Sequence, residues 1–190
     1  DFAGRIKKEA VRMTGLINDI LMISRLETKE AEVVMTDVRV SVLLEEIVGG
    51  LKPQAAAGQV FIHIDCQPLM IRANAQHMRE LFTNLIGNAV KYNRPGGQVW
   101  VNVRESDRQM VARVRDNGVG IPEDSLDRIF ERFYRVDKSH SKEIGGTGLG
   151  LSIVKHAAAY HDAKIQLDSQ LGRGTRVRVL FPLSQREAQP

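Results

Sequence analysis

The sequence predicts an α/β two-layer sandwich, a mixed sheet covered on one face by helices, preceded by one long amphipathic helix. Two observations predict this class. Segments with the three-to-four-residue periodicity of helices alternate along the chain with segments of β-like alternation. Neighbouring β-like segments are joined by short turns typical of hairpins, so the helices are left to one face of the sheet. With 190 residues, 43% of them hydrophobic, the chain can bury one sizeable core.

Composition excludes several other classes of protein. No run of apolar residues approaches the roughly 20 that span a bilayer, and the first ten residues lack the order of a signal peptide. The single cysteine, Cys66, excludes an internal disulfide. The net charge of +4 comes from interspersed acidic and basic residues, so we expect neither nucleic-acid binding nor membrane contact. A helical pattern is already under way at the first residue, and we expect a piece of a longer chain.

The first predicted element is an amphipathic helix over residues 6–24. Its apolar residues repeat at intervals of three and four and form a broad stripe, at Ile6, Ala10, Met13, Leu16, Ile17, Ile20, Leu21 and Ile23. Such a stripe fits a helical hairpin or four-helix bundle better than a two-stranded coiled coil, and one helix cannot complete a bundle. We therefore expect residues 1–30 to need partner helices. Packing on the rest of the same chain is the alternative.

Local signals predict the elements of a second unit, residues 31–183. The expected order is a β-like run at Val33–Val40, a helix capped by Ser41 that fades over residues 49–59, a strand in VFIHID, a helix at Ala75–Tyr92 capped by Asn74, strands at Gln98–Glu105 and Gln109–Arg115, a short helix near Glu123–Phe130, a helix at Leu149–His161, and strands at Ala163–Ser169 and Thr175–Phe181. The region 116–146 has little other regular pattern, and loops of that length are usually functional or mobile. Residues 184–190 are expected to be a disordered tail.

Polar residues that folding does not require mark one face of the predicted helix at Ala75–Tyr92. Asn84 and Asn88 are four residues apart and Lys91 follows three later, so the three side chains share a face. Asparagine is a mediocre helix former, but its carbonyl oxygen suits Mg²⁺, and a nearby lysine balances phosphate charge. Capping or bridging of backbone groups is the structural alternative for both asparagines.

A second candidate group follows the strand that ends near Asp116. Gly118 and Gly120 allow close backbone approach in the next turn, and a carboxylate placed there can accept a hydrogen bond from the amino group of adenine. Asp-Asn-Gly is also an ordinary turn sequence. Further on, aromatic residues accompany Arg132 and Arg135, whose planar guanidinium groups suit phosphate oxygens. Packing on the sheet is the alternative for at least one of these arginines.

The stretch GGTGLGLSIVKH, residues 145–156, turns directly into a helical pattern. Glycines at a helix start let backbone N–H groups approach an anion such as phosphate. The stretch is no Walker loop, because Gly150 is followed by Leu151 and Ser152, and no dinucleotide fingerprint, because position 151 is not glycine. The residues alone leave the kind of phosphate loop open.

Five stretches resemble, in order and spacing, the N, G1, F, G2 and G3 boxes of bacterial sensor histidine kinases: ELFTNLIGNAVKYN, DNGVGIP, IFERFYRVD, GGTGLGLSIVKH and GRGTRVRVLFP. INDILMISRLE also resembles the second helix of the family's dimerisation and histidine-phosphotransfer hairpin, so the resemblance covers nearly the whole chain. Within the family, the phosphate-starvation type looks most similar. The resemblance implies the Bergerat ATP-binding fold, shared with gyrase, the ninety-kilodalton heat-shock chaperone and MutL, with ATP and Mg²⁺ as cofactors.

The resemblance also implies a role for each matching residue. Asn88 would ligate Mg²⁺ and Asn84 would help to order the same site. Lys91 and Arg135 would contact phosphates, and Asp116 would bind the adenine amino group, so Asn84, Lys91 and Arg135 are the expected catalytic residues. The other residues expected to line the nucleotide site are Tyr92, Gly118, Gly120, Ile121, Phe133, Gly146, Thr147, Gly148, Leu149, Gly150 and Thr175. Residues 137–146 would form a mobile lid over the phosphates.

The implied activity is that of a protein-histidine kinase, which transfers the γ-phosphoryl group of Mg-ATP to a histidine for relay to an aspartate of a response regulator receiver domain. The family's acceptor histidine lies in a His-Glu or His-Asp motif followed shortly by Thr-Pro, or a close variant, on the first helix of the hairpin. None of the chain's five histidines has that context, so we expect no autophosphorylation by these residues alone. The resemblance further implies a homodimer through the helical hairpin and a cytoplasmic position in a membrane-anchored bacterial kinase.

Two alternatives remain beside the kinase. One is a slow ATPase of the same superfamily, slow because Asn84 stands where hydrolysing relatives carry a glutamate. The other is a nucleotide-binding interaction or dimerisation module.

Overall fold

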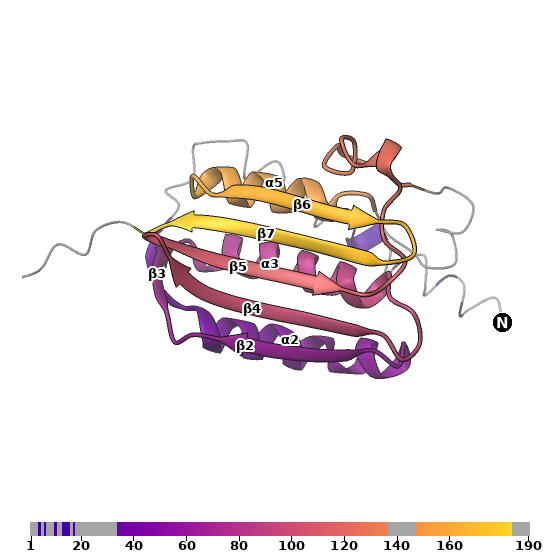
Figure 1. The fold of residues 1–190 in the computed structure, drawn as a ribbon, viewed down its shortest axis with the longest axis horizontal. Coiled ribbons are helices and arrows are strands. Elements are labelled where there is room, and N and C mark those ends of the chain that lie inside the picture. The colour runs from indigo at the N-terminus through magenta and orange to yellow at the C-terminus, as the bar shows by residue number, and fades with distance from the viewer. Residues whose placement is uncertain are drawn as a thin grey trace, which may run out of the picture.

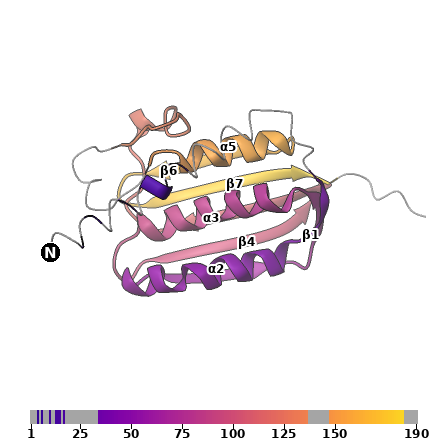
Figure 2. The ribbon, with the colours of Figure 1, turned by 180° about the vertical axis from the view of Figure 1, so that it is seen from behind.

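The computed structural model describes residues 34–136 and 147–183, together with positions 4, 6, 10, 13–15 and 17. The elements of this part are, in order, β1 (Thr36–Arg39), α2 (Val40–Ala57), β2 (Phe61–Cys66), β3 (Met70–Ala73), α3 (Ala75–Lys91), β4 (Gln98–Ser106), β5 (Gln109–Asp116), the 3₁₀ turn η1 (Glu123–Ser125), α5 (Gly150–Tyr160), β6 (Lys164–Gln170) and β7 (Gly174–Pro182). A sheet forms one layer, seen from its open face in Figure 1, and α2, α3 and α5 cover its other face, seen in Figure 2. The predicted two-layer sandwich is confirmed.

The larger sheet is mixed, with strand order β2-β4-β5-β7-β6. β2 runs parallel to β4, while the pairs β4–β5, β5–β7 and β6–β7 are antiparallel. The hairpins β4–β5 and β6–β7 therefore pair with each other through β5 and β7. β2 pairs with β4 at the edge of the sheet, and the crossover connection between these two parallel strands contains α3. β1 and β3 pair as a separate antiparallel ribbon.

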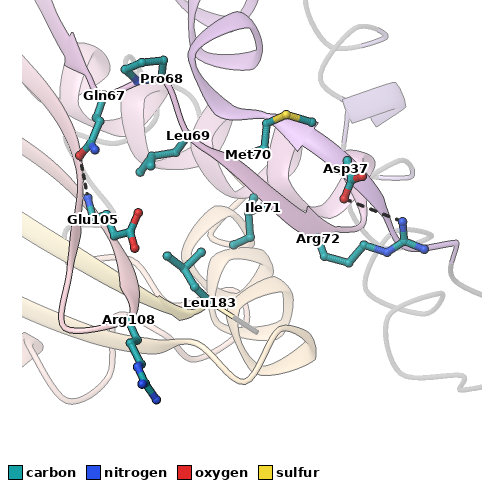
Figure 3. Close-up of a pocket in the computed structure, with 10 residues that line it drawn as sticks. All are labelled: Asp37, Gln67, Pro68, Leu69, Met70, Ile71, Arg72, Glu105, Arg108 and Leu183. Atoms are coloured by element: carbon teal, nitrogen blue, oxygen red, sulfur yellow. Dashed lines mark hydrogen bonds and ion pairs between the residues drawn. The ribbon is translucent and has the colours of Figure 1, made fainter. Parts of the chain in front are cut away.

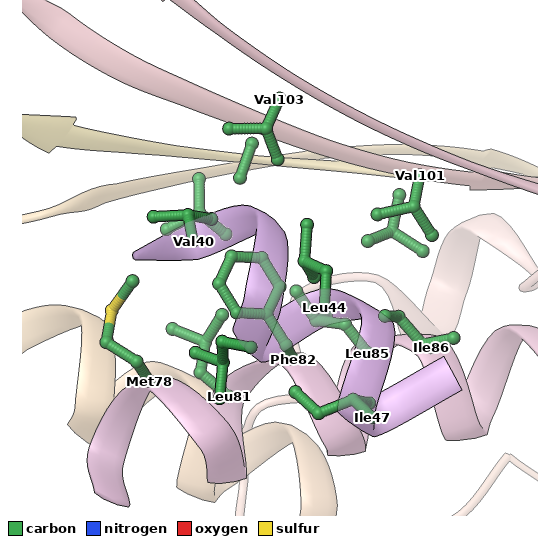
Figure 4. Close-up of a cluster of buried hydrophobic side chains, with 14 of the residues drawn as sticks. Val40, Leu44, Ile47, Met78, Leu81, Phe82, Leu85, Ile86, Val101 and Val103 are labelled. Atoms are coloured by element: carbon green, nitrogen blue, oxygen red, sulfur yellow. The ribbon is translucent and has the colours of Figure 1, made fainter. Parts of the chain in front are cut away.

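The hydrophobic core lies between the sheet and the helices. Val99, Val101 and Val103 on β4 point toward the helices, because successive side chains of a strand face opposite sides. They belong to one cluster with fully buried side chains of α2 and α3, among them Leu44 and Phe82 (Figure 4). Burying one side chain of this kind contributes about 1.5–3 kcal/mol. The apolar face of α3 therefore holds this helix in place, and its other face is left for polar residues.

The start of α3 is as predicted, whereas the start of α2 is not. Asn74 caps α3, because its Oδ1 accepts a hydrogen bond from the His77 N–H at 2.9 Å. α2 already begins at Val40, and no side chain caps it, so the predicted cap by Ser41 is wrong. The Val40 N–H donates instead to the Leu69 carbonyl at 3.1 Å, which satisfies a backbone donor at the helix start without a side chain.

The predicted fading of α2 at residues 49–59 is also wrong. The helix continues to Ala57. Gly49 and Gly50 lie on its exposed side, while Val48 and Ala55 are buried. Tertiary packing of the buried side therefore outweighs the low helix propensity of the two glycines.

Two further differences concern short elements. The sequence did not reveal β3, whose four residues are held by pairing with β1. The helix predicted near Glu123–Phe130 is reduced to η1, because the chain after it forms hydrogen bonds of the i to i+3 kind, from Arg128 to Ser125 and from Glu131 to Arg128, rather than a continuous helical ladder.

The N-terminal segment has helical conformation at its described positions. Ile6, Met13 and Ile17 are each more than half exposed, at 56%, 61% and 54%, so at these positions the stripe does not pack on the rest of the chain. The other residues of the predicted first helix and the predicted tail, residues 184–190, lie outside the described residues. Across the part of the chain that the structure describes, no helix combines the length and apolar character needed to cross a membrane.

Candidate nucleotide-binding site

The polar face of α3 lies against the first residue of α5. Asn84 and Asn88 are half-buried, and the Asn84 Nδ2 donates to the Glu80 carbonyl at 2.9 Å. Its Oδ1 lies near Gly150, since a Cβ added at Gly150 would stand 2.6 Å from it. The same Cβ would stand 3.7 Å from the Asn88 Nδ2. The bridging alternative therefore holds for the amide nitrogen of Asn84, while its oxygen faces the glycine at which α5 begins.

Positive charge gathers where α3 ends. The Lys91 Nζ lies 5.2 Å from the centre of the Tyr92 ring. Burial lowers the pKa of Lys91, and the positive charge of Arg135 lowers it further. Burial raises the pKa of Tyr92, and Arg135 opposes that shift. The charge of Arg135 acts on Lys91 and both residues are cationic, so the end of α3 favours an anion such as phosphate.

Asp116 is a buried carboxylate at the end of β5, 9% exposed. Its Oδ1 accepts hydrogen bonds from the N–H groups of Gly118 at 2.9 Å and Thr175 at 3.2 Å. Burial raises the pKa of Asp116, while these two N–H groups and the charge of Arg115 act in the opposite direction. Within residues 34–136 and 147–183, Oδ2 has no hydrogen-bond partner, which leaves it able to accept one from a ligand.

The turn after Asp116 is held on both sides by backbone. A Cβ at Gly118 would stand 2.4 Å from the Tyr92 carbonyl oxygen, and one at Gly120 would stand 2.0 Å from the Gln170 carbonyl oxygen. Gly120 also has a φ of +68°, in the left-handed region. Both glycines thus let the turn pass close to the backbone of Tyr92 and Gln170. The sequence did not suggest these two contacts.

Ser169 is a residue of this region that the sequence reasoning missed. Its Oγ accepts a hydrogen bond from the Ile121 N–H at 2.8 Å and lies 2.8 Å from the Thr175 Oγ1. It also donates to the Gly174 carbonyl at 3.0 Å. Ser169 thereby joins Ile121 to Thr175, whose own N–H donates to Asp116. Its only signal in the sequence was its place opposite Thr175 in a predicted hairpin.

The predicted F and G2 stretches meet at Phe133 and Gly148. The Phe133 N–H donates to the Gly148 carbonyl at 3.0 Å, and both residues have positive φ, +63° and +76°. A Cβ at Gly148 would come within 2.8 Å of the Phe133 backbone, so only glycine fits there. Next to it, the Leu149 N–H donates to the Thr147 Oγ1 at 3.2 Å, and Leu149 is fully buried. These contacts fix the chain just before α5.

The structure thus brings most of the predicted site residues to one end of the sandwich. Gly146 and the predicted lid, residues 137–146, lie outside the described residues. The Arg132 Nη2 lies 3.4 Å from the His156 Nε2 on α5, a contact with a helix and not the expected packing on the sheet.

A separate hollow of about 950 Å³ lies at the other end of the strands (Figure 3). It is lined by residues of β1, of β3 and the segment before it, of the end of β4 and the turn after it, and by the residue after β7. These are Asp37, Gln67, Pro68, Leu69, Met70, Ile71, Arg72, Glu105, Arg108 and Leu183. None of the predicted site residues is among them. The hollow therefore does not belong to the candidate nucleotide site, which is assembled around Asp116 at the opposite end of β5.

Comparisons with known proteins point to one family. Residues 73–185 match the family model described as histidine kinase-, DNA gyrase B-, and HSP90-like ATPase. The sensor protein kinase WalK of Staphylococcus saprophyticus is 32% identical over 183 residues, 95% of this chain and 30% of the relative. WalK of Staphylococcus haemolyticus is 33% identical over 184 residues, with the same coverage. The chain thus spans about 30% of the length of these relatives.

Solved structures agree with this similarity. ShkA, crystallised at full length in complex with AMPPNP, superimposes with a TM-score of 0.82 at 27% identity, over 96% of this chain and 38% of ShkA. The mycobacterial sensor histidine kinase MprB gives a TM-score of 0.69 at 23% identity, over 79% of this chain and 98% of that chain. At this identity the similarity shows only that the two chains share a fold. These findings support a sensor histidine kinase and do not support the expected phosphate-starvation type.

Proposed function

The chain belongs to the family of histidine kinase-, DNA gyrase B- and HSP90-like ATPases as the ATP-binding catalytic domain of a sensor histidine kinase, and on this premise we propose that its site positions Mg-ATP for phosphoryl transfer to a histidine. The accepting histidine would lie outside these residues. The phosphoryl group would then pass to an aspartate of a response regulator.

One observation carries the proposal, namely that the groups an ATP site requires converge at one end of α3. Asn84 and Asn88 face the start of α5. Lys91 and Arg135 supply positive charge beyond them. Asp116 lies beside the same helix end, because its turn packs on the Tyr92 carbonyl.

The cationic residues would act on the phosphates. In phosphoryl transfer, charge is spread over the oxygens of the transferred group, so catalysis comes mainly from positioning and charge neutralisation. Lys91 and Arg135 would supply that neutralisation. Backbone N–H groups at the start of α5, from Gly150 on, would add donors that the helix itself leaves unpaired.

Asn84 and Asn88 fit a Mg²⁺ ion, because Mg²⁺ takes few protein ligands and completes its shell with phosphate oxygens and water. Held by these residues, Mg²⁺ would supply positive charge to neutralise the phosphates. Asn88 would be the ligand and Asn84 would order the same face. Asn84 carries no carboxylate and cannot activate water as a base, which supports phosphoryl transfer over hydrolysis.

Asp116 would select the base. With Oδ1 fixed by two backbone N–H groups, its other oxygen can accept a hydrogen bond from the exocyclic amino group of adenine. Guanine presents a carbonyl oxygen at the corresponding ring position and would place an acceptor against an acceptor. The site would therefore prefer ATP to GTP.

The histidines of the chain do not suit the acceptor role. His77 and His161 are buried, and His63 lies on the edge strand β2. We therefore place the acceptor on a helical hairpin whose second helix is the N-terminal segment, and through which the full-length kinase would dimerise. The same proposal makes this domain the cytoplasmic portion of a membrane-anchored sensor kinase.

Calorimetry of ATP binding, with and without Mg²⁺, tests the proposal. Wild type should bind ATP more tightly with Mg²⁺. Asn88→Asp places a carboxylate beside the phosphates, so binding without Mg²⁺ should weaken at least about tenfold and the dependence on Mg²⁺ should steepen. Gln54→Glu makes the same amide-to-acid change on the exposed side of α2 and should leave binding unchanged.

Two outcomes would contradict the proposal. One is a folded wild type that binds no ATP, which would favour an interaction module. The other is multiple-turnover hydrolysis of ATP by the domain alone, which would favour an ATPase.

A further inference from the structure

The open face of the sheet carries a cluster of arginines that the nucleotide site does not use. β5 and β7 are neighbours, and their antiparallel register places Arg113 opposite Arg178 and Arg115 opposite Arg176. All four alternate with buried residues, so their side chains leave the sheet on the face away from the helices, the face seen in Figure 1. We call these four residues the arginine quartet.

Like charges directly opposite each other on neighbouring strands destabilise a sheet. The quartet contains two such pairs at the centre of the face. Asp168 on β6 is the register partner of Arg176, but no ion pair joins them. Among the residues that the structure describes, none of the quartet forms a salt bridge. No ion pair within the described residues offsets this repulsion.

Arg178 has a second unsatisfied feature. Its Nε is buried and has no hydrogen-bond partner within the described ranges. A buried guanidinium donor without an acceptor is costly, and contacts within the described part of the chain do not offset that cost. Because Nε itself is buried, a bound anion would contact the exposed part of the Arg178 side chain.

The surroundings of the quartet narrow the class of ligand. Trp100 on β4 has the Arg115 guanidinium 5.2 Å from its ring centre on one side and His63 stacked at 6.1 Å on the other. Both faces of the indole are thus occupied, and it cannot act as a platform for a nucleic-acid base. Asp168 on β6 borders the quartet on one side, while Asp65 on β2 is paired with Arg104 and does not offset the charge of the quartet.

We propose that the arginine quartet is a docking surface for an acidic polypeptide segment, on a protein partner, with carboxylates at alternate positions of an extended strand. Residues two apart in a strand are separated by about 6.6–7 Å, so alternate carboxylates match the spacing of Arg113 and Arg115 along β5. Arginine binds carboxylates through paired hydrogen bonds. The surface lies on the face of the sheet opposite the helices that carry the nucleotide site.

Fluorescence of Trp100 tests the proposal, because it is the only tryptophan of the chain and touches the quartet. The probe is the peptide acetyl-(Glu-Thr)₆-amide, with acetyl-(Gln-Thr)₆-amide as its neutral match. The acidic peptide should give a saturable change that weakens as salt rises. Arg113→Gln/Arg178→Gln should raise Kd at least about tenfold. Arg39→Gln/Arg108→Gln removes the same charge from exposed positions off this face and should raise Kd less than about twofold.

Three results would overturn the proposal. The first is no Trp100 response to the acidic peptide. The second is equal loss of binding in both double variants, which would show dependence on net charge alone. The third is tighter, quartet-dependent binding of single-stranded oligo-dT than of the peptide. The quartet variant should melt no lower than wild type, because repulsion is removed, and should bind ATP normally, so this test does not depend on the nucleotide site.

Discussion

At the scale of single residues, the two carboxylate oxygens of Asp116 have different surroundings. Asp116 uses one oxygen to hold the turn and the second strand of the neighbouring hairpin, through Gly118 and Thr175. Its other oxygen is left for a ligand. In the proposed function, structure and recognition would be divided between two atoms of the same group, and a substitution would remove one role while keeping the other.

Asp116→Asn separates the structural role of Asp116 from its proposed role in binding the base. The amide oxygen can still accept from Gly118 and Thr175, but the remaining position becomes an NH₂ donor that would face the adenine amino group. We expect ATP affinity to fall at least about tenfold, because a donor placed against a donor leaves both unpaired. The unfolding midpoint should change little. Calorimetry and thermal unfolding measure the two effects.

Asp168→Asn is the matched control for this change, since it removes the same charge from an exposed position on β6. It should leave ATP affinity within about twofold of wild type. Equal losses in both variants would mean that the effect is electrostatic at long range and that Asp116 does not contact the base.

The sequence indicated the candidate site residues better than their contacts. Asn84 and Lys91 could be selected because each is a polar residue that its helix does not need, and Asp116 because it ends a strand before a glycine-containing turn. Ser169 could not, because a serine in an exposed-looking strand carries no signal until Thr175 is known to face it. The contact of Gly120 with Gln170 was hidden for the same reason, since it joins segments far apart in the chain.

At the scale of elements, the start of α5 is fixed by what it packs against. Gly150 begins the helix where a side chain would collide with Asn84. Glycine is a poor helix residue, so its use here reflects the close approach of α5 to α3. In α2, by contrast, Gly49 and Gly50 face open space.

This contrast gives a paired prediction. Gly150→Ala should push Asn84 away from α5 and weaken Mg-ATP binding at least about fivefold, because a 2.6 Å contact cannot be kept. Gly49→Ala should leave ATP binding unchanged and raise the unfolding free energy by about 0.5–1 kcal/mol through helix propensity. Calorimetry and urea unfolding separate the two. Unchanged nucleotide affinity in Gly150→Ala would show that the position of Asn84 does not matter for binding.

Element boundaries were predictable where a local signal decides them and not elsewhere. Asn74 capped α3 as expected because the cap is formed within three residues. The start of α2 depended instead on the Leu69 carbonyl, and β3 exists only as the partner of β1. Pairings of this kind are set by tertiary structure, which local patterns do not contain.

At the scale of the whole molecule, two buried histidines join the beginning of α3 to the end of α5. The Asn74 N–H donates to the His161 Nε2 at 3.1 Å, and the His161 Nδ1 lies 2.7 Å from the Ala157 carbonyl. His77 packs edge-on against Tyr160 and near His161, and its Nδ1 has no partner in the described part of the chain. Both rings are held in the neutral form.

Stability should therefore depend on pH. Burial, with a smaller effect of His161, lowers the pKa of His77 from 6.5 to about 4. Burial also lowers the pKa of His161, against the opposing effects of the Ala157 carbonyl and Asp162. As pH falls, the unfolded chain takes up protons first, so the stabilisation present above pH 6.5 is lost toward pH 4. For His77 alone we expect about 2–3 kcal/mol.

Urea unfolding from pH 7 to pH 4.5 measures this loss. His77→Phe keeps an aromatic ring against Tyr160 without a titratable group and should flatten the pH dependence. His63→Gln, on the exposed edge strand, should leave it as in wild type. An unchanged slope in His77→Phe would assign the pH dependence to other groups.

The arginine quartet also belongs to this scale. In the sequence its members are two spaced pairs, and no dense basic run predicted an anion-binding surface. Only the register of β5 with β7 brings the two pairs together. Charge that is dispersed along the chain is therefore concentrated by the sheet, which composition and local patterns cannot show.

β7 is the last strand of the sheet in sequence, yet it lies inside the sheet between β5 and β6. During synthesis the hairpin of β4 and β5 can form locally. Met110 on β5 can pair with Phe181 only after β7 has been synthesised. Until then one edge of β5 has no partner strand, and such edges invite wrong pairing while the chain is on the ribosome. Non-local pairings of this kind also form slowly. The five-stranded sheet therefore cannot be completed before residues 174–182 have emerged.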